Sequence, residues 1–377
     1  MVDEFSEPNQ KPDVSRRTFL GATLASGAAL LSGGCVRPGA PTAVGKPAMN
    51  PIGVYNEWGR LREVIVGVLP DDALVPTPTH FCYAYMGKAT LELLQTRQGQ
   101  LLKEVALDVF EGTLRQLDGL VKAYEQAGVK VHRARPWTTE EQRFLEHLAV
   151  GGFPVYMRDP ILVVGKHVIE LAVKTPFRRR EVFAIREVLQ QRVIEDPQAR
   201  HVSMPHPLPV KPTPTSDGPG PFLEGGDIFV MDKNILVGNS GLASDRAGIE
   251  WLQRYLEAEG YQVHEVPLQP NWLHLDCIFA VVRRGLAICD KSGLKNGLPA
   301  VLNSWEIIPA TPEEAHALGC NTVCLEENTV LIAEEHSRLI KKLEKRKANV
   351  VSGFRLDVMS QWGGGIRCAT HPLLRDT

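Results

Sequence analysis

The sequence predicts a single α/β domain in which short strands close around an axis, helices lie outside and loops meet at one mouth. Hydrophobic residues make up 44% of the 377 residues and charged residues 23%, a globular composition that can fill a large core. A unit of two hairpin strands, a helix and a further strand recurs about five times, which is typical of radial or stacked architecture. The many hairpins argue against the competing fold, an ordinary doubly wound sheet.

The first unit begins with an apolar, β-rich run at residues 61–69. A helical pattern follows over about 91–127 and ends at Gly128, where glycine favours a helix stop. The short apolar stretch VKVHRA then indicates a further strand. We therefore expect a strand, one long helix and a second strand in this part of the chain.

Four hairpins are predicted after this unit, each an apolar run broken by a short turn. They are DPILVVGKHVIE, turning at 165–166, GGDIFVMDKNILVGNS, turning at 232–234, DCIFAVVRRGLAICD, turning near 284–285, and NTVCLEENTVLIAEE, turning at 327–328. Helices are expected over 179–191, 243–259 and 337–347, and further strands in YQVHEVPL and NVVSGF.

Residues 1–35 are expected to be an export signal. Arg16 and Arg17 precede a small, apolar, uncharged run to Leu31, which is typical of a twin-arginine signal peptide. The run is too short for a membrane span, which needs ~20 apolar residues. The stretch LSGGC suggests lipoprotein processing that makes Cys35 the lipid-bearing N-terminus, although ordinary cleavage nearby is the alternative.

Residues 36–51 are rich in proline, glycine and alanine and are predicted to be a flexible tether. The catalytic domain is then expected to span 52–377. An exported protein of the periplasm or cell envelope follows from this interpretation, attached to a membrane only through the lipid that Cys35 would carry.

Charge and cysteine usage argue against several classes of site and partner. The net charge is −2 and no basic stripe is interleaved with aromatic residues, so nucleic acid is not an expected partner. The seven cysteines are scattered without a CxxC pair, which argues against both a zinc site and a disulfide framework. No metal or other cofactor is predicted. The basic cluster RRRE at 178–181 is expected to be a solvated helix face or a local anion contact.

Polar residues stand just before strands in four of the units, at the same phase of each. They are Asp159 in MRDP, Glu224 and Asp227 in LEGGD, His274 and Asp276 in NWLHLD, and Cys368 in GGGIRC. Each has an ordinary alternative on its own, such as a turn residue, a surface carboxylate or a buried histidine. Their shared placement favours a common site where the loops meet.

These residue types fit one chemistry. A cysteine nucleophile needs an acid–base partner, and His274 could serve if Glu224 orients and charges it. Asp159 and Asp276 could hold a planar cation with several N–H donors, and a guanidinium is such a group. The sequence therefore predicts a metal-free cysteine enzyme that acts on a guanidine.

The ordered motifs resemble the guanidine-modifying superfamily, the penteins, which comprise amidinotransferases, arginine deiminases and dimethylarginine hydrolases. The resemblance runs from NEWGRLREVIVG through RDPILVVG, EGGDIF and HLDCIF to GGGIRC. It implies a five-bladed, pseudo-symmetric α/β propeller of ββαβ-type units, and glycines that bring the backbone before the cysteine close to the substrate. The implied site residues are the nucleophile Cys368, the general acid–base His274, its partner Glu224 and the substrate-binding Asp159, Asp276 and Asp227.

The preferred function is transfer of an amidino group from arginine or a related guanidine to an amine acceptor, through a covalent amidino-cysteine. NEWGRLREVIVG resembles the glycine and inosamine amidinotransferases, whereas EGGD and GIRCATHPLLR resemble the deiminases. A deiminase or dimethylarginine-type hydrolase that uses water is therefore the alternative. A non-catalytic binding module is a third interpretation, against which the complete set of site residues argues. A homo-oligomer is possible, and the sequence names neither the donor nor the acceptor.

Overall fold

The computed structural model describes residues 51–377 of the chain. The predicted signal peptide, Cys35 and almost all of the predicted tether lie outside the described residues. The described residues form one compact unit. No helix in the described part combines the length and apolar character that crossing a membrane requires.

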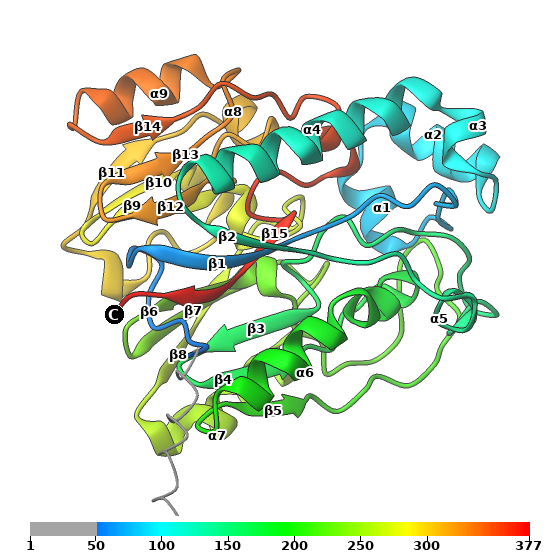
Figure 1. Cartoon of the computed structure of the whole chain (residues 1–377), viewed down its shortest axis with the longest axis horizontal. Coiled ribbons are helices and arrows are strands. Elements are labelled where there is room, and N and C mark those ends of the chain that lie inside the picture. Colours follow the sequence, from blue (N-terminus) through cyan, green and yellow to red (C-terminus); the bar gives the residue numbers. More distant parts are fainter. Residues whose placement is uncertain (1–50) are drawn as a thin grey trace, which may run out of the picture. The chain divides into compact units, whose positions relative to one another are not determined.

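The described strands pair into five separate three-stranded sheets, so the predicted mixed α/β class is confirmed. In every sheet the middle strand pairs antiparallel with one neighbour and parallel with the other. The first sheet joins distant parts of the chain, because β1 (Leu61–Val66) lies between β15 (Thr370–Arg375) and β2 (Lys130–Arg133). Figure 1 shows β1 and β15 side by side.

The other four sheets are each built from consecutive strands, as the hairpin pattern predicts. They are β3 (Ile161–Val164), β4 (His167–Glu170) and β5 (Arg200–Ser203); β6 (Ile228–Met231), β7 (Asn234–Asn239) and β8 (Gln262–Pro267); β9 (Phe279–Arg283), β10 (Leu286–Cys289) and β11 (Glu306–Pro309); and β12 (Val323–Glu326), β13 (Thr329–Leu331) and β14 (Asn349–Val351).

The four predicted hairpin turns are confirmed. Each contains one residue with a positive φ angle, which a tight turn between two antiparallel strands demands. These residues are Gly165 (53°), Asp232 (57°), Gly285 (80°) and Asn328 (71°). The hairpin strands β3 and β6 are buried along their whole length, which explains why their sequences, ILVV and IFVM, are continuous apolar runs rather than alternating patterns.

In four of the five sheets a helix precedes the parallel third strand: α4 (Leu107–Gln126), α6 (Arg186–Glu195), α7 (Arg246–Leu256) and α9 (Ser337–Glu344). Figure 1 shows α4, α6 and α9 lying against the outer side of their sheets. Leu339 and Leu343 of α9 are completely buried, one turn apart on one face, as expected for an amphipathic helix. The remaining helices are α1 (His80–Tyr85), α2 (Lys88–Arg97), α3 (Leu102–Val105), α5 (Thr139–Arg143) and α8 (Pro312–His316).

Two helix predictions were wrong in extent. The pattern at 91–127 is divided among α2, α3 and α4, because Gly99 turns the chain with a φ of 76° and Leu101 forms a β-bridge with Leu74. The pattern at 179–191 is a 3-10 helix, Pro176–Ala184, followed by α6. The second departure brings Phe177, Arg178 and Glu181 to the site described below, and in both places tertiary contacts override local helix preference.

Candidate active site

The six predicted site residues lie in the segments that lead into β3, β6, β9 and β15. Asp159 precedes β3, Glu224 and Asp227 precede β6, His274 and Asp276 precede β9, and Cys368 precedes β15. All six are buried, with no more than 3% of any residue exposed. Burial of so many ionisable groups is costly unless they are paired or hydrogen-bonded, so their contacts define what the site can do.

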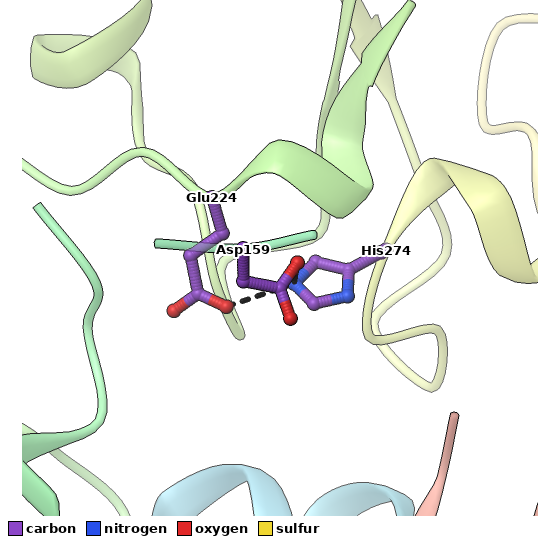
Figure 2. Close-up of side chains that lie close together, drawn as sticks. All are labelled: Asp159, Glu224 and His274. Carbon is purple, nitrogen blue, oxygen red and sulfur yellow. Dashed lines mark hydrogen bonds and ion pairs between the residues drawn. The ribbon is translucent and has the colours of Figure 1, made fainter. Parts of the chain in front are cut away.

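His274 lies between two carboxylates. Its Nε2 is 2.9 Å from Oε2 of Glu224 and 3.8 Å from Oδ1 of Asp159. Burial alone would lower the pKa of His274, but the charges of Asp159, Glu224 and Asp227 outweigh it and raise the pKa to about 10. The ring is therefore a protonated acid at neutral pH that donates to Glu224. Figure 2 shows the three side chains pointing toward one another.

Ligand atoms of Asp159, Glu224 and His274 all lie within 4.8 Å of one another, a spacing that would admit a metal ion. In the structure, Nε2 of His274 and Oε2 of Glu224 are joined to each other by a hydrogen bond. The arrangement is explained by an imidazolium held by carboxylates.

Cys368 is held from two sides. Its thiol lies 3.7 Å from Oδ2 of Asp276, and Nδ2 of Asn321 donates to its Sγ at 3.1 Å. Burial, Asp276 and Asp159 together raise the pKa of Cys368 well above its ordinary value. The resting cysteine is therefore a thiol, and formation of the reactive thiolate requires a cation to enter beside it.

Asp276 is tied to a buried arginine that the sequence analysis missed. Arg367 Nη1 lies 3.3 Å from Oδ2 of Asp276, and Nη2 lies 3.1 Å from Oε1 of Glu57. The Arg367 guanidinium also lies 3.8 Å from the ring centroid of Phe229. Arg367 and Glu57 both stand inside motifs that identify the superfamily, GGGIRC and NEWGR, so their positions could have been noticed.

Asn321 is the second residue that the sequence analysis missed. Its Oδ1 accepts from the backbone N–H groups of Arg367 at 2.8 Å and Cys368 at 3.1 Å. Its Nδ2 donates to Cys368 Sγ and to the backbone carbonyl of Asp276. One buried amide thus fixes the nucleophile relative to its neighbouring carboxylate.

Asp227 differs from its predicted role as a substrate-binding residue. Like Glu224 and Asp276, it does not line the cavity beside Cys368, and both of its carboxylate oxygens are occupied by backbone donors. Its Oδ1 accepts from the backbone N–H of Leu275 at 3.0 Å and its Oδ2 accepts from that of Ser244 at 3.2 Å. Burial raises the pKa of Asp227 to about 7. We assign it to holding the loop that carries His274.

The prediction that residues 178–181 form a solvated face was wrong, whereas the alternative, an anion contact, fits. Arg178, Arg180 and Glu181 are buried. Arg178 Nη2 lies 2.8 Å from Oε2 of Glu181 and 2.9 Å from Oδ2 of Asp159, one of the two predicted clamp carboxylates. Burial raises the pKa of Glu181 to about 7.

The glycines before Cys368 make room for protein side chains. A Cβ on Gly364 would collide with the ring of Tyr156, and one on Gly365 would lie 2.9 Å from Oδ1 of Asn321. Gly363 has a φ of 88°, which a side chain would strain. Gly364 and Gly365 therefore allow Tyr156 and Asn321 to approach the backbone just before the cysteine, a role that the resemblance alone did not indicate.

Comparison with known proteins identifies the family. Residues 102–375 match the family described as N,N dimethylarginine dimethylhydrolase, eukaryotic. The chain belongs to this family. Its membership of the guanidine-modifying superfamily, predicted from the ordered motifs, is thereby confirmed.

Individual relatives of this dimethylarginine dimethylhydrolase family member include several amidinotransferases. Inosamine-phosphate amidinotransferase 1 of Streptomyces griseus is 27% identical over 351 residues, which cover 87% of the chain and 98% of the relative. L-arginine:L-lysine amidinotransferase of Pseudomonas savastanoi pv. phaseolicola is 25% identical, with 86% and 95% covered.

Solved structures show the same fold. An amidinotransferase of the saxitoxin pathway from Microseira wollei has a TM-score of 0.71 at 24% identity, covering 87% of the chain and 98% of that structure. A dimethylarginine hydrolase from Pseudomonas aeruginosa has a TM-score of 0.59 at 16% identity, covering 83% and 100%. The prediction that the chain is an enzyme of the amidinotransferase or guanidine-hydrolase class is confirmed.

In this family member a cavity of about 50 Å³ lies beside Cys368. Asp159, Arg178, Glu181 and His274 contribute its charged lining, and the rest is apolar, aromatic or glycine apart from the cysteine itself. Glu224 and Asp276 do not line the cavity themselves. Glu224 contacts His274, and Asp276 contacts Cys368. The site therefore combines a thiol, a proton donor and an excess of negative charge, which suits a cationic substrate.

Proposed function

We propose that the protein transfers an amidino group from a guanidine to an amine acceptor, with Cys368 as the covalent carrier. The observation that carries the proposal is the buried thiol of Cys368 in one cavity with the protonated His274, surrounded by carboxylates. The amidinotransferases among its relatives, which the chain matches along almost their whole length, support transfer.

The guanidinium binds first. Asp159 and Asp276 offer carboxylate oxygens to its N–H groups, in charge-assisted hydrogen bonds. Its positive charge offsets the carboxylates that hold the pKa of Cys368 high, so the thiol releases its proton to solvent as the cation enters. Substrate binding thereby creates the nucleophile, and the free enzyme keeps an unreactive thiol.

The thiolate then attacks the central guanidine carbon. A sulfur–carbon bond forms, and the carbon–nitrogen bond to the leaving amine breaks while His274 gives that nitrogen its proton. The products of this half-reaction are a free amine, an amidino-Cys368 and a neutral His274. Glu224, 2.9 Å from Nε2, holds the ring in place for this transfer.

The acceptor amine completes the cycle. Its nitrogen attacks the amidino carbon, His274 takes a proton from that nitrogen, and the sulfur–carbon bond breaks to return the thiolate. In the hydrolase alternative a terminal nitrogen leaves instead and water attacks the covalent intermediate, which would convert arginine to citrulline. The matched family favours this alternative, because its description names a dimethylarginine hydrolase.

The architecture and location of the protein form a second part of the proposal. The five three-stranded sheets, together with likeness to amidinotransferase structures, support an arrangement as five blades with the site where β3, β6, β9 and β15 begin. The twin arginines at 16–17 support export to the periplasm or cell envelope, and LSGGC supports lipidation of Cys35. A homo-oligomer stays a prediction of the sequence.

The test is to incubate the purified protein with a guanidine, with and without an amine. An amidinated acceptor that forms only when the amine is present supports the transferase. A ureido product that forms without any amine marks the hydrolase. Absence of both products favours the binding-module interpretation.

A further inference from the structure

Arg367 is 1% exposed, and its guanidinium is held at both terminal nitrogens. Its Nη2 donates to the backbone carbonyl of Ile228 at 2.6 Å and lies 3.1 Å from Oε1 of Glu57. Its Nη1 donates to the carbonyl of Gly225 at 3.4 Å and lies 3.3 Å from Oδ2 of Asp276. Contacts from separate segments therefore fix the plane of this cation relative to Asp276.

Asp276 depends on Arg367 for its negative charge. The carboxylate is completely buried, and in the described part of the chain Arg367 is the only cation within ion-pair distance of it. Burial raises the pKa of Asp276, and the charge of Arg367 acts most strongly against this rise. A carboxylate that is buried without such a partner takes up a proton, because its charged form is costly away from water.

The other titratable groups around Asp276 do not replace this cation. His274 and Arg158 lie beyond ion-pair distance, and both favour the ionised form of Asp276 less than Arg367 does. The charge of Asp159 disfavours the ionised form. The remaining groups stay neutral, because burial and neighbouring anions raise their pKa. They are Cys368, Cys277 and Tyr85.

The position of Arg367 leaves one oxygen of Asp276 for the substrate. Oδ2 lies against Nη1 of Arg367, whereas the donor nearest to Oδ1 among the described side chains is the thiol of Cys368, at 3.8 Å. A thiol is a weak donor, and it has no proton to give once the thiolate has formed. Oδ1 can then accept from an N–H group of the incoming guanidinium.

Glu57 is the second carboxylate that contacts Arg367, and its surroundings differ from those of Asp276. Burial alone would raise the pKa of Glu57, but three arginines outweigh it and lower the pKa below its ordinary value. They are Arg367, Arg158 and Arg375. Without Arg367, Glu57 would still face two cations, so Asp276 is the carboxylate that we expect to take up a proton.

We propose that Arg367 is a positioning residue that keeps Asp276 ionised and orients it to receive the guanidinium of the donor. The inference rests on the proposed function, in which Asp276 is one of the two carboxylates that bind this group. Arg367 acts through Asp276 and does not line the cavity beside Cys368. Its loss should therefore change the pH at which the donor is used, in addition to any effect on the fold.

The first test needs no turnover. Infrared difference spectroscopy detects the carbonyl band of a protonated carboxylic acid, which an ionised carboxylate lacks. The variant Arg367→Met removes the charge and keeps a long side chain that can pack on Phe229. At pH 6, its spectrum minus that of the wild type should contain such a band, and adding Asp276→Asn should remove the band. Other buried acids, such as Asp227 and Glu181, are present in both proteins and cancel.

Further variants separate charge from folding. Arg367→Met leaves Glu57 without one of its cations, which can prevent folding. The double variant Glu57→Gln, Arg367→Met removes both charges of this ion pair and should show the same band, again abolished by Asp276→Asn. Glu57→Gln alone keeps Arg367, and Arg367→Lys keeps a cation, so neither should show it. Arg375→Met is the matched control, because Arg375 is a buried arginine whose Nη1 donates to backbone carbonyls.

The second test measures use of the donor as a function of pH. Consumption of arginine is followed by mass spectrometry at pH 6 and pH 9, with glycine and lysine as acceptor amines. The ionised fraction of Asp276 rises as pH rises through its pKa, so a raised pKa impairs the variant most at low pH. The ratio of kcat/KM in Arg367→Met to that in the wild type should be about tenfold higher at pH 9 than at pH 6. In Arg375→Met this ratio should be the same at both values.

The outcomes separate the inference from the proposed function. The inference is overturned if a folded Arg367→Met protein, single or double, lacks a band that depends on Asp276. A band of equal size in Arg367→Lys, or a kcat/KM ratio that does not change with pH, also overturns it. If the wild type consumes no guanidine and Cys368 is never modified, the proposed function fails, whereas the infrared band still decides whether Arg367 keeps Asp276 ionised.

Discussion

Replacing Asn321 by alanine tests how the fold prepares the nucleophile. The substitution removes the Nδ2–H that donates to Cys368 Sγ at 3.1 Å, and the Oδ1 that accepts from the backbone N–H groups of Arg367 and Cys368 at 2.8 and 3.1 Å. Loss of the Nδ2–H affects the charge on the sulfur atom, and loss of Oδ1 affects the stability of the fold.

The size of each consequence follows from the hydrogen bonds lost. A hydrogen bond to a charged group is worth about 1.5–3 kcal/mol, so losing the donor should destabilise the thiolate by about that amount and raise the pKa of Cys368 further. At a fixed pH below that pKa, the thiolate fraction should fall about ten- to hundredfold. Two buried N–H groups left without their main acceptor should lower the free energy of unfolding by about 2–6 kcal/mol.

The assay is alkylation of Cys368 by iodoacetamide, followed by peptide mass spectrometry as a function of pH. Asn303→Ala is the matched control, because Asn303 is an exposed asparagine. A purely structural role for Asn321 would lower the melting temperature without moving the pH profile. An unchanged alkylation rate in a folded Asn321→Ala variant would refute the idea that this amide stabilises the thiolate.

The remaining predictions concern the clamp, the loop support and export. Asp159→Asn and Asp276→Asn each remove a charge-assisted contact worth about 1.5–3 kcal/mol. Each variant should therefore stay folded and bind a guanidine about ten- to hundredfold more weakly in calorimetry. Normal binding in both variants would show that these residues have structural roles only. The pKa of Asp227 is about 7 in the folded protein, so its protonation stabilises the fold fully below about pH 4, and this stabilisation is lost as pH rises through 7. In urea unfolding, the Asp227→Asn variant should therefore be most destabilised relative to wild type near pH 4. A loss of stability that does not change with pH would contradict this. Replacing Arg16 and Arg17 by lysine should hold the precursor in the cytoplasm in a fractionation experiment, whereas unchanged export would remove the twin-arginine prediction.

Much of the sheet architecture was predictable because its signals are local. Each hairpin is a short apolar run with a turn residue that accepts positive φ, and such patterns need only neighbouring residues to be recognised. The long helix at 91–127 was predicted wrongly for the opposite reason. Leu101 pairs with Leu74, a tertiary contact that helix periodicity cannot reveal.

The site was predictable only in part for the same physical reason. Glu224, His274 and Cys368 could be grouped, because each stands just before a strand of a repeating unit and their chemistry is complementary. Asn321 and Arg367 act through contacts with residues tens to hundreds of positions away, and neither is a nucleophile or a proton-transfer group. Their roles become visible only when the loops are assembled in space.

The central claim is that Cys368 carries the amidino group. The most direct test is to quench the wild-type protein during turnover with a guanidine and locate the added mass by peptide mass spectrometry. The account predicts an amidino adduct on Cys368, no adduct in a folded Cys368→Ser variant, and slower adduct formation in His274→Ala, because the leaving amine then lacks its proton donor. An active Cys368→Ser variant, or an adduct on the neighbouring Cys277 in place of Cys368, would contradict it.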